Sequence, residues 1–205
     1  MKMEIGIVIA LITLSGVMFT AINQTLGIWL KSYMEMRHKR MAMPLDQKLA
    51  FNMEADRLCL QLRKQLGADR VFLANFHNGG QFKSGVGIDK FTIVSEDYSD
   101  SAEISLKRLY EGTLLSYAPF TFHKLLTEDR YFVCQTHCML DKAFKKDLIN
   151  RGVKSVYLFV IKDLNGEPLA FIEIAFNKQH DLDLENQNAV WQYHNKFLRV
   201  IKMKH

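Results

Sequence analysis

Two cysteines and a histidine stand close together in the second half of the chain. Cys134, His137 and Cys138 follow one another closely, and His123 lies upstream. Thiolates and imidazoles are common zinc ligands, so the cluster is a candidate metal site. A structural zinc site needs a fuller set, however, and Cys-x-x-x-Cys supplies only half of one. The alternative is a pair of buried thiols beside a surface histidine. Because the ligand set is incomplete, we predict no metal and no bound cofactor.

A second group of candidate residues ends a predicted strand. His77 and Asn78 stand in the sequence Phe-His-Asn-Gly. A neutral imidazole there could exchange hydrogen bonds with a ligand. The alternative is that both residues only shape the turn, which Asn-Gly favours by itself. Glu173 poses a similar choice, because inside an apolar strand it either lines a pocket or faces solvent. The alternation along a half-exposed strand favours solvent.

Catalytic signatures are missing from the sequence. No nucleophile stands in a local motif such as Gly-x-Ser-x-Gly, and Asp181, Asp183 and Glu185 are typical first-turn acids of a following helix. Three cysteines give no disulfide framework, which is typical of a reducing compartment. The formal net charge of +5 comes without a zinc-finger, homeodomain or P-loop pattern. We therefore expect neither an enzyme nor a nucleic-acid-binding protein.

The start of the chain has the composition of a membrane span. Residues 5–30 carry no charged side chain, and this stretch is long enough to cross a bilayer as a helix. Four basic residues follow it, namely Lys31, Arg37, Lys39 and Arg40. The positive-inside rule then places the rest of the chain in the cytoplasm, on the inner (cell) membrane. A cleaved signal peptide is the alternative, but no small-residue cleavage site follows. The predicted parts are a tail and transmembrane helix over 1–30, a basic linker over 31–43 and a soluble domain over 44–205.

Helical periodicity is clearest at 44–66. Apolar residues recur there with a 3.6-residue period and form one stripe. Its members are Phe51, Ala55, Leu58, Leu62 and Leu66. Leu45, Leu49 and Met53 form a second stripe off that face, so we expect this helix to pack against two surfaces.

The remaining sequence alternates between strand and helix patterns. A glycine-rich loop is predicted over 78–87, and an Asn-Gly turn over 163–167 joins the clearest hairpin. Residues 119–126 are ambiguous, with a short strand as one reading. The predicted strands are 70–77, 88–95, 153–161 and 168–176. The predicted helices are 101–116, 139–150 and 183–203.

This order of elements resembles that of GAF domains, which have a central antiparallel sheet flanked by helices. The resemblance covers about residues 44–203 and is strongest in the stretch GVKSVYLFVIKDLNGEPLAFIEIAF, which looks like the last hairpin of that fold. The PAS fold is the next best match, but it usually lacks this pair of terminal helices. The resemblance implies an α+β class with a GAF-like central antiparallel sheet, preceded here by one N-terminal transmembrane helix.

The resemblance also implies how such a domain works. GAF domains commonly pair through their first and last helices, here 44–66 and 183–203, and cup a ligand between the sheet and a lid. The ligand-binding residues that this implies are His77, Asn78, Phe91, Tyr131 and Cys134. The expected function is a membrane-anchored, non-catalytic sensory or protein-interaction domain. It would form a homodimer and signal through the membrane helix or an unidentified protein partner.

The layout of one membrane helix and one soluble domain also resembles that of T-type phage holins. In this alternative the chain is a lysis or lysis-timing membrane protein with a soluble regulatory domain. The polar residues Asn23, Gln24 and Thr25 would help its membrane helices to assemble. Holins of this type hold their soluble domain in the periplasm, so membrane topology separates the two functions.

Overall fold

A computed structural model describes most of the chain, which divides into the units Met1–Leu45 and Asp46–His205. The described residues are 23–32, 44–81, 87–100, 102, 104–127, 131–181 and 184–202. In the first unit, residues 23–32 form an exposed helix that includes Lys31. None of the described helices combines the length and apolar character of a membrane span. Most of the predicted span at 5–30 lies outside the described residues, as do Arg37, Lys39 and Arg40, so the anchor stays a prediction.

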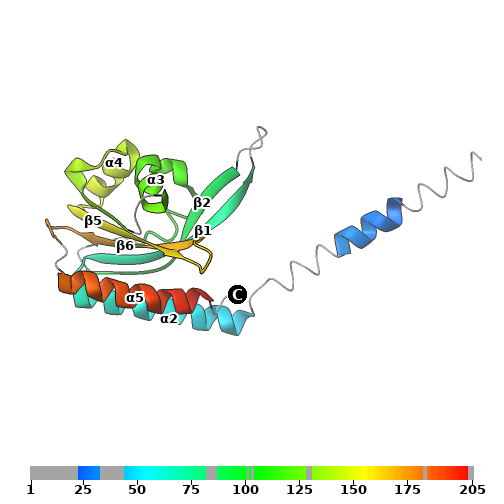
Figure 1. The fold of residues 1–205 in the computed structure, drawn as a ribbon, viewed down its shortest axis with the longest axis horizontal. Helices are drawn as coiled ribbons and strands as arrows, with labels where there is room; N and C mark the ends of the chain where they lie inside the picture. The colour runs from blue at the N-terminus through cyan, green and yellow to red at the C-terminus, as the bar shows by residue number, and fades with distance from the viewer. Residues whose placement is uncertain are drawn as a thin grey trace, which may run out of the picture. The chain divides into compact units, whose positions relative to one another are not determined.

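The second unit is built on one antiparallel sheet of six strands. Its strand order is β3-β2-β1-β6-β5-β4, and the sheet curls across the domain (Figure 1). The strands are β1 (Arg70–Gln81), β2 (Gly87–Tyr98), β3 (Thr113–Leu114), β4 (Tyr131–Gln135), β5 (Ser155–Lys162) and β6 (Pro168–Phe176). The first and last strands in the sequence, β1 and β6, pair with each other at the centre of the sheet.

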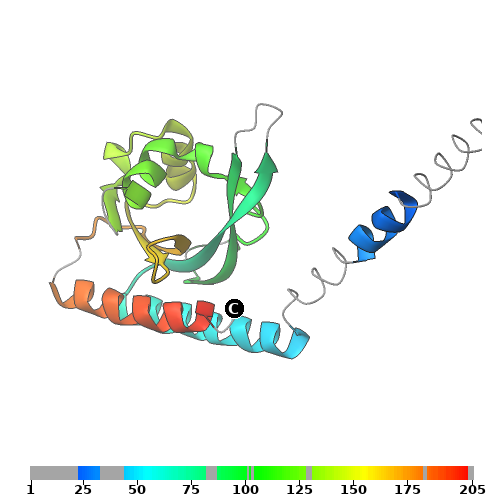
Figure 2. The ribbon, with the colours of Figure 1, turned by 45° about the vertical axis from the view of Figure 1, so that its right-hand side comes forward.

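Helices cover both faces of this sheet. On what we call the outer face, α2 (Leu45–Leu66) and α5 (Leu184–Lys202) run antiparallel, side by side, in both views (Figures 1 and 2). The inner face carries α3 (Pro119–Thr127) and α4 (Lys142–Asn150). Short 3-10 helices, η1 and η2, lie at Leu115–Tyr117 and Thr136–Cys138. The predicted α+β class, with an antiparallel sheet flanked by helices, is confirmed.

The predicted stripe of α2 is buried against the outer face. Ala55, Leu58 and Leu62 are fully buried, and each leucine buried in this way contributes about 1.5–3 kcal/mol of hydrophobic stabilisation. The helix ends at Gly67, whose φ of 61° is the left-handed conformation of a C-cap. The second stripe does not take part in this packing, because its three side chains are exposed.

The predicted hairpin is confirmed as β5 and β6. Its turn is held by Asp163, whose Oδ1 accepts hydrogen bonds from the amides of Asn165 and Glu167, both at 2.8 Å. Gly166 adopts a φ of 86°, which a glycine takes without strain. Both strands are buried almost throughout because helices cover both faces of the sheet.

The predicted helix over 101–116 is wrong. Residues 107–112 form turns, and Thr113–Leu114 and Leu115–Tyr117 are β3 and η1. Gly112 has a φ of 64°, so the chain reverses just before β3. Apolar spacing alone suggested a helix, but only Leu106 and Tyr110 of that pattern are buried.

Distant side chains bind the backbone of this segment in place of a helix. The carboxylate of Glu96 accepts a hydrogen bond from the Leu106 amide at 3.0 Å. The guanidinium of Arg70 donates to the carbonyls of Ala102 and Ile104 at 3.0 and 2.7 Å. Backbone groups satisfied in this way no longer need helical partners. The sequence gives no local sign of this arrangement.

Three predicted boundaries also change. The ambiguous segment 119–126 is helical and lies in α3, which begins at Pro119. Strand pairing extends into both ends of the predicted loop 78–87, because β1 reaches Gln81 and β2 begins at Gly87. The helix predicted from residue 139 begins at Lys142, after the turn of η2.

Candidate functional site

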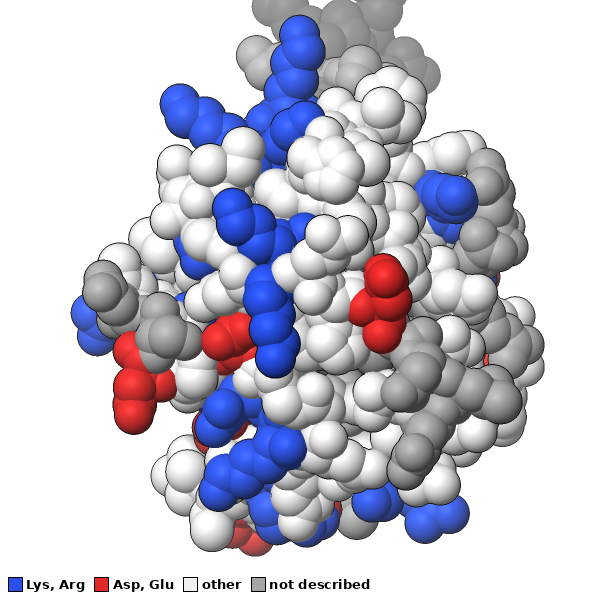
Figure 3. Space-filling model, turned by 90° about the vertical axis from the view of Figure 1, so that its left-hand side faces the viewer, with Lys and Arg blue, Asp and Glu red and all other residues white. Residues whose placement is uncertain are grey.

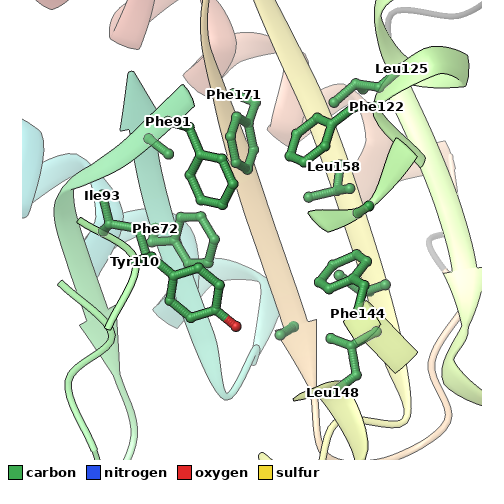
Figure 4. Close-up of a cluster of buried hydrophobic side chains, with 14 of the residues drawn as sticks. Phe72, Phe91, Ile93, Tyr110, Phe122, Leu125, Phe144, Leu148, Leu158 and Phe171 are labelled. Carbon is green, nitrogen blue, oxygen red and sulfur yellow. The ribbon is translucent and has the colours of Figure 1, made fainter. Parts of the chain in front are cut away.

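Aromatic side chains fill the space between the inner face of the sheet and α3 and α4 (Figure 4). The ring of Phe171, on β6, lies 5.2 Å from that of Phe91 on β2, between centroids, and 5.4 Å from that of Phe122 on α3. Both neighbours meet it edge to face, the arrangement that aromatic quadrupoles favour. We call this cluster the aromatic core, and its members are Phe72, Phe76, Phe91, Tyr110, Tyr117, Phe122, Phe144 and Phe171.

The aromatic core leaves almost no room for a ligand. The cavity among these rings has a volume of about 10 Å³. A single water needs about that much space, whereas pockets for small molecules hold about 300–1,000 Å³. A ligand therefore has no room among these rings. The predicted lid is the glycine-rich loop 78–87, of which residues 82–86 lie outside the described residues, so a ligand beneath that loop stays a prediction.

A buried ion cluster lies at one end of the aromatic core. Arg151, which follows α4, donates to a carboxylate oxygen of Glu173 at 2.8 Å and to Asp147 at 2.8 Å. Glu173 is only 2% exposed, so the prediction that it faces solvent is wrong. The predicted alternation is right, because Glu173 shares a face with Phe171, but α3 and α4 cover that face. Arg151 was missed as a partner because the contact depends on tertiary structure.

Burial and pairing act in opposite directions on this cluster. Burial raises the pKa of Glu173, whereas the neighbouring guanidinium of Arg151 lowers it, and burial is the larger effect. Burial alone would lower the pKa of Arg151, but the carboxylates of Glu173 and Asp147 raise it above its ordinary value. The guanidinium therefore stays charged and balances the carboxylates beside it. Because these groups are satisfied by one another, the arrangement is suited to holding α4 on β6.

A second buried pair holds the irregular segment after β2. Arg70 contacts Glu96 at 3.0 Å, and both side chains are nearly inaccessible. A hollow of about 520 Å³ lies beside Arg70 and Arg151. Both guanidinium groups already face carboxylates, so this hollow does not offer an unbalanced positive charge to an anion.

Asp141 is a further residue that the sequence did not single out. It directly precedes α4, yet its carboxylate accepts hydrogen bonds from the α3 amides of Phe120 and Thr121 at 3.1 and 2.8 Å. The Thr121 hydroxyl donates to the same carboxylate at 2.6 Å. The carboxylate thus caps the N-terminus of α3, where a negative charge is favourable. A cap supplied from a distant segment gives no Ncap signal in the local sequence.

The structure does not bring the predicted ligand-binding residues together. His77 is exposed on β1, and its Nε2 lies 2.9 Å from Oγ1 of Thr92. Asn78, the next residue, is also exposed. Phe91 is buried in the aromatic core and pairs across the strands with Phe76. Since side chains alternate along β1, His77 points to the face opposite Phe76 and Phe91.

The same separation holds on β4. Cys134 packs against the aromatic core, while Tyr131 lies on the outer face near Trp191 of α5. Tyr131 therefore shares no pocket with Phe91 or Cys134. The five predicted residues lie on two faces of the sheet.

The candidate metal ligands do not form a cluster in the described part of the chain. Cys134 donates to the carbonyl of Gln135 at 3.1 Å, and burial raises the pKa of its thiol. Cys138 and His137 are exposed. Across the described residues, no three side chains of His, Cys, Asp or Glu are placed to hold a metal ion.

Basic side chains gather at the end of the domain where β5 begins (Figure 3). Lys145, Lys154 and Lys178 line an open hollow of about 720 Å³ together with His137. The described residues around it include no carboxylate. Lys145 is held in place by donating to the carbonyl of His137 at 2.6 Å. This surface can attract anions, but its open arrangement of lysine side chains does not form a defined binding site.

Comparison with known proteins assigns the fold. No family model and no curated protein matches the sequence. Solved structures do match, among them the phycoerythrobilin-bound GAF domain from a cyanobacterial phytochrome. It is 15% identical, with a TM-score of 0.59, over 82% of this chain and 93% of that chain.

Two bacterial structures give the same result. The GAF domain/HD domain protein from Geobacter sulfurreducens is 10% identical, with a TM-score of 0.58, over 79% of this chain and 98% of that one. The GAF domain region of a provisionally named membrane protein from Geobacter sulfurreducens PCA is 13% identical, with a TM-score of 0.55, over 78% and 97%. At identities of 15% or less, the likeness concerns architecture and not binding properties. The chain therefore carries a domain with the GAF fold.

Proposed function

We propose that this chain is a membrane-anchored, non-catalytic sensory or protein-interaction domain that forms a homodimer through α2 and α5. Its GAF fold supports the sensory class, since a solved neighbour is a chromophore-bound domain of a phytochrome. The filled aromatic core favours contacts with protein over capture of a small molecule in that space. The signal would then pass to the membrane helix or to a protein partner.

One observation supports the proposed homodimer most directly. On α2, the stripe formed by Leu45, Leu49 and Met53 is 72%, 53% and 73% exposed, respectively. The opposite side of the same helix is buried against the sheet. A helix that only covers its own domain is normally polar on its outer side, and contiguous exposed apolar side chains mark interaction surfaces. A second copy of α2 offers the matching apolar stripe.

The full chain in maltoside micelles provides the test. Light scattering after size exclusion should find a dimer, and the pair of changes Leu49→Glu and Met53→Glu should weaken dimerisation about a hundredfold or more, because two charges would be buried at the interface. Leu140→Glu is a matched control, since Leu140 is 73% exposed outside α2. A monomeric wild type, or a dimer untouched by both changes, would contradict the proposal.

Membrane topology tests the proposed location. Paired reporters fused to the C-terminus, one active only in the cytoplasm and one only in the periplasm, should give the cytoplasmic signal, because Lys31 and its basic neighbours follow the apolar segment. A periplasmic signal would reverse the orientation and favour the lysis-protein alternative.

A further inference from the structure

A small aromatic pocket lies on the outer face, at the free edge of the sheet. It has a volume of about 170 Å³ and sits between β4, β5 and α5. The described residues that line it are Tyr131, Val133, Tyr157, Phe159, Asp181, Gln187 and Trp191. Because β4 is the last strand of the described sheet, the pocket lies at the sheet edge. Its volume suits a small organic group and is below the size typical of drug-like ligands, about 300–1,000 Å³.

The rings in this pocket meet at a corner. Tyr131 and Phe159 lie on neighbouring strands, with centroids 5.9 Å apart and planes only 24° apart. Trp191 on α5 stands nearly perpendicular to Phe159, at 86° and 5.8 Å. Two ring planes that meet near a right angle, one of them an indole, form the kind of partial cage that receives a cation against aromatic faces.

The polar groups of the pocket are acidic or neutral. Asp181 is an exposed carboxylate, and its Oδ1 lies 3.4 Å from the amide nitrogen of Gln135. No lysine or arginine is among the described residues that line the pocket. Elsewhere in the described domain, basic side chains lie over the rings of Tyr98 and Tyr193. The rings around Asp181 thus combine an aromatic corner, a negative charge and no described internal cation.

We infer that this pocket binds a small quaternary ammonium compound. The polar groups of the described lining are the Asp181 carboxylate, the Gln187 amide and the hydroxyls of Tyr131 and Tyr157, of which the last already donates to the carbonyl of His180. One charged group among aromatic rings suits a cation that needs no hydrogen-bond acceptors. A quaternary ammonium has no N–H donors, and it offers methyl groups to the rings of Tyr131 and Trp191 and a diffuse charge to Asp181. The site is on the face of the sheet opposite the aromatic core, and it does not depend on the dimer.

Fluorescence of Trp191 reports on the pocket directly. The chain has two tryptophans, so Trp29→Phe leaves Trp191 as the only one. The full chain carrying this change is titrated with choline in a maltoside detergent, because a phosphocholine detergent would itself supply the ligand. We expect a saturable change in emission with choline and none with 3,3-dimethyl-1-butanol, its neutral isostere. An equal response to both compounds would overturn the proposal, as would no response to millimolar choline.

Variants separate the cation site from general packing. In the Trp29→Phe background, Tyr131→Leu and Asp181→Asn should each weaken choline binding about tenfold, through loss of a ring face or of the charge. Tyr131→Phe keeps the ring and should bind normally. Phe120→Leu, at an exposed site on α3, is the matched control. Loss of binding in Phe120→Leu, or unchanged binding in both Tyr131→Leu and Asp181→Asn, would contradict the assignment.

Discussion

At the scale of single residues, the most consequential contact joins Arg151 to Glu173. Arg151→Met removes the positive charge and leaves the buried carboxylate of Glu173 without its guanidinium partner. We expect this change to lower the free energy of unfolding by about 3–5 kcal/mol, the usual cost of breaking a buried ion pair from one side. Urea unfolding of the purified chain, followed by circular dichroism, measures it.

A double-mutant cycle distinguishes the pair from general packing. Adding Glu173→Gln to Arg151→Met removes the unpaired charge, so the double variant should be more stable than the sum of the single losses implies. Arg108→Met, at an exposed arginine, should change stability by less than about 0.5 kcal/mol. Strict additivity of the two losses would mean that Arg151 and Glu173 do not interact.

The same residues mark what the sequence could predict. Alternation along β6 correctly places Glu173 on the face of Phe171, because a strand fixes side-chain direction through its period of two. Whether that face is covered depends on where α3 and α4 pack. The ion pair joins residues 22 positions apart in the sequence, so no local pattern links them. No strand was predicted at 131–135, where the structure has β4, so the separate faces of Tyr131 and Cys134 could not be predicted either.

The three cysteines should differ sharply in reactivity. Cys59 is fully buried on α2, and burial raises the pKa of its thiol to about 12. At pH 8 only about one molecule in ten thousand would then carry the reactive thiolate. Burial also raises the pKa of half-buried Cys134, whereas Cys138 is exposed. We expect a disulfide reagent to modify Cys138 quickly, Cys134 slowly and Cys59 only after unfolding.

The rate phases can be assigned by substitution. Cys138→Ser should remove the fast phase and leave the slow one, and denaturant should release all three thiols at once. Fast modification of Cys59 in the folded protein would show that α2 opens from the sheet much more readily than its burial implies.

At the scale of elements, α3 depends on a cap that comes from outside it. Asp141→Ala removes the acceptor for two α3 amides and the Thr121 hydroxyl. We expect a loss of about 2–3 kcal/mol in the free energy of unfolding, because charged caps and buried hydrogen bonds are both lost. Hydrogen exchange should speed up at the amides of Phe120 and Thr121. Asp46→Ala, at an exposed acid in the first turn of α2, should leave α3 protection unchanged.

An element could be predicted from the sequence when its hydrogen-bond partners lie close to it in the chain, and not when they lie far away. The buried stripe of α2, the helix at 183–203 and the turn at Gly166 are encoded locally, and the structure confirms them. The segment 101–116 has helical apolar spacing, yet Glu96 and Arg70 bind its backbone from another part of the sequence. Tertiary partners can override a local pattern in this way, since propensity contributes less than packing. Residues 119–126 were ambiguous in the sequence because the residue that caps α3, Asp141, comes from another part of the chain.

At the scale of the whole molecule, the two faces of the sheet have different properties. The inner face is closed by the aromatic core, with a cavity of about 10 Å³. The outer face carries the α2 stripe and the pocket beside Trp191, with a volume of about 170 Å³. A ligand or partner would therefore act on the side of the two terminal helices. Movement of α5 against β5 could then reach α2 directly, because the two helices run side by side (Figure 2).

Opening the inner face by mutation tests this division. Phe122→Ala removes a ring that lies 5.5 Å from Phe91 and 5.4 Å from Phe171, between centroids. The cavity it leaves should lower the free energy of unfolding by about 3–5 kcal/mol. Benzene should then raise the melting temperature of this variant, because a dry apolar cavity binds such molecules. The wild type should not respond, since its core has no space to fill. Phe120→Ala is the matched control, because Phe120 lies on the same helix but is 64% exposed, and should change neither property. A wild type stabilised by benzene would show that the inner face opens to ligands, and would return the sensory site to that side of the sheet.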